Sequence, residues 1–141
     1  KTKDYCLNLL TQSICKVLPF HGIKHTLEVF ENVETIGSYE GVSEEEIEIL
    51  KIAGLFHDIG ISQEYIGHES ISANYANTYL SGLNYPNKVT VEILNCINAT
   101  KMPQNPKSTL ECIICDADLL HLSSSNYLFK NEGIYGFDFH R

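Results

Sequence analysis

Four residues of metal-ligand type lie in apolar surroundings: His25, the adjacent pair His57 and Asp58, and Asp118. His25 begins an apolar stripe at helical spacing, the pair lies in LFHDIG, and Asp118 lies in CDADLLHL. A lone histidine on an apolar face is more often a hydrogen-bonded core residue than a ligand. A buried ionised carboxylate, however, costs several kcal/mol unless it is paired or bound to a metal. Two imidazoles and two carboxylates together therefore predict a site for one divalent cation.

The elements that carry these residues are predicted to be helices. Apolar residues recur at helical spacing in six segments, and no strand-length window alternates with period two. We expect an all-α fold in which about six irregularly packed, antiparallel helices form a single domain over residues 1–141. The helices are expected over residues 4–18, 25–38, 44–59, 67–80, 86–100 and 106–121, and KMPQNP is expected to be a loop.

Two local signals concern the helix that ends at the His-Asp pair. Ser43 followed by Glu46 is a capping box, which predicts the start of this helix. Adjacent residues of a regular helix point about 100° apart, so His57 and Asp58 cannot both face one ion within it. We expect Gly60 to end the helix and thereby allow both side chains to turn to the same ion.

Composition limits the partners and the compartment. The chain has 141 residues, 43% of them hydrophobic, and a formal net charge of −8, which disfavours nucleic acid or an anionic membrane as a partner. No apolar run approaches the roughly 20 residues that span a bilayer, and no signal peptide is visible. Five cysteines favour free thiols in a reducing compartment, so we expect a cytoplasmic location. Cys112 and Cys115 are interpreted as small buried hydrophobes rather than as a metal or redox pair.

The ordered set of ligand-type residues resembles that of the HD-domain superfamily of metal-dependent phosphohydrolases. The resemblance runs through FHGIKHTLEVF, AGLFHDIG, GHESISANYANTYL and CDADLLHL. It implies that His25, His57, Asp58 and Asp118 bind the metal. Asp118 is preferred to Asp116, which could instead orient a ligand. The implied cofactor is one divalent ion, Mn²⁺, Fe²⁺, Co²⁺ or Mg²⁺, with Zn²⁺ less favoured because it usually takes fewer ligands.

Other residues are candidates for catalysis and substrate binding. His68 and Glu69 are either exposed residues of a first helical turn or, as the resemblance implies for His68, a second-metal ligand or an acid near the leaving group. With Asp58 they form the candidate catalytic set. His21 and Lys101 are candidates to contact substrate. The alternatives are a surface histidine and a cation at a helix C-terminus.

The chain departs from the family pattern at two places. Ala99 and Thr100 stand where binuclear members carry a histidine, which favours one metal. Ile61 stands where some mononuclear members carry an acidic residue, so Glu64 or Glu69 must supply that carboxylate, or the activity is lost or altered. Related chains often continue with more helices, so we expect part of the pocket wall to be absent or built differently.

The predicted function is hydrolysis of a nucleotide or another small phosphorylated metabolite by a metal-activated water. The alternative is a catalytically altered HD domain that binds such a ligand as a regulatory module. An oxygenase with two irons is disfavoured by Thr100. A purely structural helical domain would require the ligand-type residues to fall in the family order by chance.

Overall fold

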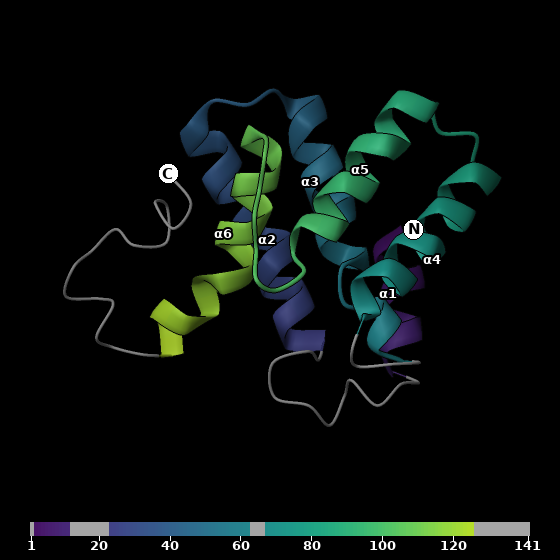
Figure 1. Cartoon of the computed structure of the whole chain (residues 1–141), viewed down its shortest axis with the longest axis horizontal. Helices are drawn as coiled ribbons and strands as arrows, with labels where there is room; N and C mark the ends of the chain where they lie inside the picture. Colours follow the sequence, from purple (N-terminus) through teal and green to yellow (C-terminus); the bar gives the residue numbers. More distant parts are fainter. Residues whose placement is uncertain (1, 12–22, 63–66, 126–141) are drawn as a thin grey trace.

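The computed structural model describes residues 2–11, 23–62 and 67–125 (Figure 1). Over these residues the chain is all-α, as predicted, with six α-helices, one short 3-10 helix and no strand. In chain order the elements are α1 (Thr2–Thr11), α2 (Ile23–Glu40), α3 (Glu44–Phe56), η2 (Ile59–Ser62), α4 (His68–Gly82), α5 (Asn87–Ala99) and α6 (Thr109–Ser125).

Helix α3 is the centre of the packing. It contacts each of the other five α-helices, and every residue from Ile52 to Phe56 is buried. A helix that is apolar on all sides is stable in water only when neighbouring helices surround it. The C-terminal end of α3 therefore delivers the residues that follow it, His57 and Asp58, into the interior of the protein.

The start of α3 confirms the predicted capping box. The Ser43 hydroxyl accepts a hydrogen bond from the Glu46 backbone N–H at 3.1 Å, and Glu46 Oε1 accepts one from the Ser43 backbone N–H at 3.0 Å. Glu44 and Glu45 also lie in the first turn, where negative charge opposes the helix dipole. The reciprocal cap sets where α3 begins.

The prediction that Gly60 ends this helix is wrong. Helix α3 ends at Phe56 with His57 as its C-cap, and Gly60 lies within η2 with no positive φ. A Cβ atom on Gly60 would lie 2.8 Å from the Ser72 backbone nitrogen and 2.8 Å from Ile71 Cβ. The Gly60 N–H donates to Ser72 Oγ at 2.7 Å. The glycine is thus required by the close approach of α4 to η2.

The other helix ends lie near their predicted positions except at both ends of α6, which also ends at Ser125 rather than near residue 121. Pro86 is the N-cap of α5, but Pro106 does not open α6, which begins three residues later at Thr109. The Ser108 hydroxyl accepts from the Glu111 backbone N–H at 3.1 Å, so this serine caps α6. The part of the first predicted helix beyond Thr11 lies outside the described residues.

The pairs α2–α6 and α4–α5 lie side by side around α3 (Figure 1). Among the described residues, no helix is both long enough and apolar enough to cross a membrane. Cys112 and Cys115 are not joined by a disulfide. Cys115 is buried in the core and Cys112 is half-buried, as expected of small hydrophobic residues.

Candidate metal centre

Four ligand-type side chains from three helices meet beside the C-terminal end of α3. His25 lies near the start of α2, His57 and Asp58 follow α3, and Asp118 lies in α6. Helix α2 packs against both α3 and α6, which brings residues 93 positions apart into contact. The side chains of His57 and Asp58 are 1% and 3% exposed, that of His25 is 6% exposed, and that of Asp118 is 17% exposed.

The distances between these side chains are those of a compact polar cluster. Asp118 Oδ1 lies 2.9 Å from His25 Nε2 and 3.2 Å from His57 Nε2. Asp58 Oδ2 lies 3.5 Å from His57 Nε2 and 3.8 Å from His25 Nε2. Donor atoms of His25, His57 and Asp58 all lie within 4.8 Å of one another, close enough to hold one metal ion. Asp118 contacts the two imidazoles of this group.

The orientation of His57 fits a metal ligand. Its Nδ1 lies 2.7 Å from the Gly54 carbonyl oxygen, and a carbonyl only accepts, so Nδ1 carries the proton. The other nitrogen, Nε2, then faces the carboxylates. Nε2 is buried and forms no hydrogen bond of good geometry within the described residues, although Asp118 Oδ1 lies 3.2 Å away. A buried polar atom left unsatisfied is costly, and a cation bound to Nε2 would satisfy it.

The charges in the cluster depend strongly on one another. Burial lowers the pKa of His57, but the negative charge of Asp58 and the contact with Asp118 outweigh it and raise this pKa to about 10. Burial likewise raises the pKa of Asp118, but the contacts with His25 and His57 lower it to about 2. Without a cation, the carboxyl of Asp118 is therefore ionised at neutral pH and His57 is protonated. A divalent cation can take the place of that proton.

Helix α4 adds a histidine and a glutamate to the cluster. His68 Nε2 lies 2.8 Å from Asp58 Oδ1 and 3.4 Å from Glu69 Oε2. His68 and Glu69 are only 8% and 7% exposed, so their interpretation as exposed first-turn residues is wrong. The close packing of α4 on η2 at Gly60 turns the start of α4 inward. Asp58 thus lies between two groups, with Oδ2 toward His25 and His57 and Oδ1 toward His68.

The geometry bears on the choice between Asp118 and Asp116. Asp118 contacts both histidines. Asp116 is fully buried two residues earlier in α6, about 200° around the helix from Asp118. The side of α6 that faces His25 and His57 is the one that carries Asp118.

Of the remaining predicted residues, Lys101 lies apart from this cluster. Lys101 is exposed after α5 and lines a cavity of about 270 Å³ together with Lys107. None of the four ligand-type residues lines that cavity. His21 and Glu64, together with the side chain of Ile61, lie outside the described residues.

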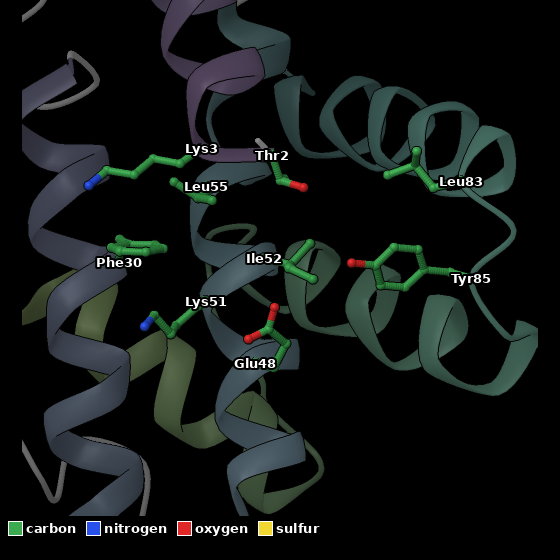
Figure 2. A pocket seen from close by; sticks show the side chains of 9 residues that line it. All are labelled: Thr2, Lys3, Phe30, Glu48, Lys51, Ile52, Leu55, Leu83 and Tyr85. Carbon is green, nitrogen blue, oxygen red and sulfur yellow. The ribbon is translucent and has the colours of Figure 1, made fainter.

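A second cavity, of about 360 Å³, lies between α1, α2, α3 and the α4–α5 turn (Figure 2). Its lining includes Lys3, Phe30 and Lys51. The ammonium groups of both lysines lie over the Phe30 ring, 5.1 Å and 4.8 Å from its centroid, and Lys51 also pairs with Glu34 at 3.2 Å. The two lysine ammonium groups thus already interact with the Phe30 ring, and that of Lys51 also with Glu34. The cavity includes no residue of the metal cluster.

Gln104 also borders the site, although it was not predicted from the sequence. This residue lies in the loop between α5 and α6, and its Nε2 donates to Asp118 Oδ2 at 3.2 Å. A single glutamine in KMPQNP carries no motif and no periodicity, so nothing in the sequence indicated this contact. Thr100 is buried and donates its hydroxyl to the Ile97 carbonyl oxygen at 2.7 Å.

Comparison with known proteins was made at the levels of sequence and structure. The HD domain family model matches residues 22–123, a range that contains all four ligand-type residues. The fold is similar to the crystal structure of a predicted HD superfamily hydrolase from an uncultured Thermotogales bacterium. That similarity has a TM-score of 0.72 at 26% sequence identity and covers 94% of this chain and 77% of the other. A search of curated proteins found no match.

Proposed function

The chain belongs to the HD-domain family, and on that basis we propose that it is a metal-dependent phosphohydrolase acting on a nucleotide or another small phosphorylated metabolite. The observation that carries the proposal is the state of His57. Its Nδ1 proton is donated to the Gly54 carbonyl, while its buried Nε2 faces two carboxylates and forms no well-aligned hydrogen bond in the part of the chain that the structure describes. This is the arrangement of a histidine built to bind a cation.

In this proposal, His25, His57, Asp58 and Asp118 hold one divalent ion. Mixed imidazole and carboxylate ligation suits Mn²⁺, Fe²⁺, Co²⁺ or Mg²⁺ better than Zn²⁺, which usually takes fewer ligands. When bound, such an ion lowers the pKa of a water ligand and polarises a phosphoryl oxygen. Thr100 in place of a histidine supports one ion rather than two, because its hydroxyl is bonded to the backbone of α5.

His68, Glu69 and Asp58 form the proposed catalytic set. The 2.8 Å contact with Asp58 Oδ1 holds the His68 imidazole at the edge of the metal cluster. An imidazole there can hold or release a proton near neutral pH, as the protonation of a leaving alkoxide requires. Glu69 Oε2 lies 3.4 Å from the same Nε2, so this carboxylate borders the proposed acid.

Lys101 and His21 are proposed to contact the substrate. The chain carries a net charge of −8, so a phosphorylated ligand needs local positive charge to approach. Lys101 follows α5 directly and shares a cavity with Lys107, which places two exposed cations near the loop that carries Gln104.

The test combines metal content with turnover. Purified protein should hold about one equivalent of Mn²⁺, Fe²⁺ or Co²⁺ by elemental analysis and should hydrolyse members of a panel of nucleotides and p-nitrophenyl phosphate mono- and diesters. His57→Ala and Asp58→Ala should each lose both properties. Glu31→Ala, which removes an exposed carboxylate from α2, is the matched control and should keep both.

Two results would count against the proposal. If the wild-type protein binds no divalent metal, the proposed function is wrong. A protein that binds metal and a nucleotide but releases no product would instead favour the regulatory module, whose site holds a phosphorylated ligand without cleaving it.

A further inference from the structure

The two oxygens of Asp118 have different partners. Oδ1 lies 2.9 Å from His25 Nε2 and 3.2 Å from His57 Nε2, on the side of the metal cluster. Oδ2 lies 3.2 Å from Gln104 Nε2, on the side of the α5–α6 loop. A carboxylate can bind a cation through one oxygen or through both. The contact with Gln104 occupies one of those two oxygens.

The orientation of the Gln104 amide follows from its neighbours. Both nearby groups, Asp118 Oδ2 and the Thr100 carbonyl oxygen, can only accept, so the amide nitrogen must face them. That nitrogen carries two protons, one for Asp118 at 3.2 Å and one for the longer 3.5 Å contact with Thr100. One side chain therefore connects the end of α5 with the ligand-bearing face of α6.

The α5 end of this connection is itself held in place. Thr100 is 4% exposed, and its hydroxyl donates to the Ile97 carbonyl oxygen at 2.7 Å. Gln104 is half-buried, so water competes less for its hydrogen bonds than for those of the exposed side chains around it. The loop thus presents a donor at a defined position beside Asp118.

We propose that Gln104 is a positioning residue that restricts Asp118 to a single ligand oxygen, Oδ1, and so leaves more of the cation's coordination positions to water and substrate. The proposal rests on the proposed function, because it requires Asp118 to bind the metal. Gln104 acts only through Asp118. Its loss should let the carboxylate leave the orientation that presents Oδ1 to the cation, which weakens binding and changes the coordination geometry.

The test uses the full chain with Co²⁺ as the probe. Gln104→Met keeps the length of the side chain but removes the donor, and Gln104→Ala removes the side chain without adding bulk. Both should weaken Co²⁺ binding about tenfold in isothermal titration, the usual size for an outer partner of a metal ligand. Both should also change the visible spectrum of bound Co²⁺, since the spectrum reports coordination geometry. Asn95→Met, which removes an exposed amide from α5, should change neither.

The outcomes separate this proposal from the one on which it rests. If wild-type protein binds no Co²⁺, both proposals fail. If wild type binds Co²⁺ and both Gln104 variants, folded by circular dichroism, keep its affinity and its spectrum, only the positioning role fails. A loss of affinity shared with Asn95→Met would likewise overturn the role of Gln104, because it would not be specific to the donor beside Asp118.

Discussion

The imidazole of His57 donates its Nδ1 proton to the carbonyl oxygen of Gly54 at 2.7 Å, one helical turn earlier in the chain. The carbonyls of the last turn of a helix have no partner within the helix. Here one of them holds a histidine ring so that Nε2 points away from the helix, toward Asp58 and Asp118. The end of α3 thus sets both the tautomer and the direction of a proposed metal ligand.

Metal binding should become tighter as the pH rises. Without a cation the pKa of His57 is raised to about 10, above its ordinary value of 6.5, so the ring is protonated at neutral pH and must lose that proton to bind. The carboxyl of Asp118, with a pKa of about 2, stays ionised and adds no pH dependence. We expect affinity for Mn²⁺ to rise about tenfold per pH unit between about pH 6 and pH 8.

Isothermal titration in buffers of different ionisation enthalpy measures this directly, because it counts the protons released on binding. About one proton per metal ion is expected at pH 7. If binding releases no proton and the affinity does not change with pH, the metal ion does not take the place of a proton on His57.

His68→Ala should separate catalysis from metal binding. The imidazole contacts Asp58 Oδ1 rather than the oxygen that faces His25 and His57, so its loss should leave the metal content near that of wild type. Turnover should fall about 10²- to 10⁴-fold, the range for removal of a general acid or base. Steady-state kinetics and elemental analysis on the same preparation provide the two readouts. Loss of the metal together with activity would make His68 a ligand instead.

Lys101→Ala should weaken substrate binding without changing metal affinity. Removal of an exposed cation near the phosphate should raise KM severalfold and leave kcat nearly unchanged, and the effect should shrink at high salt. Lys88→Ala removes another exposed cation, from the opposite end of α5, and is the matched control. Equal kinetics for the two variants would identify Lys101 as a simple cation at a helix C-terminus.

Gly60→Ala should destabilise the fold. The added Cβ would meet the Ser72 backbone nitrogen and Ile71 Cβ at 2.8 Å, closer than atoms of a folded protein normally approach. Overpacking of this kind costs about 1–3 kcal/mol of unfolding free energy, measurable by urea denaturation. Gly82→Ala is the control, because a Cβ there meets nothing within 4 Å. A Gly60→Ala protein as stable as wild type would show that α4 can move away from η2 without cost.

Much of the fold could be predicted from local signals. The capping box of Ser43 and Glu46 involves atoms within one turn, and helical periodicity involves residues three or four positions apart. These signals predicted all six helices and the start of α3. These signals predicted the helix ends less well. Helix α6 is capped by Ser108 and not opened by Pro106, because a hydroxyl that accepts a backbone hydrogen bond outweighs the favourable φ of a proline.

By itself, the sequence determined which residues are of ligand type and that they belong to helices with buried faces. Only the tertiary structure decided which of them meet. His25 and Asp118 are 93 positions apart, and their contact depends on the packing of α2 against α6. The start of α4, which carries His68, packs against Gly60 where a Cβ would clash, and the contact of Gln104 depends on the path of the α5–α6 loop. Such contacts join surfaces distant in the chain, and no local pattern encodes them.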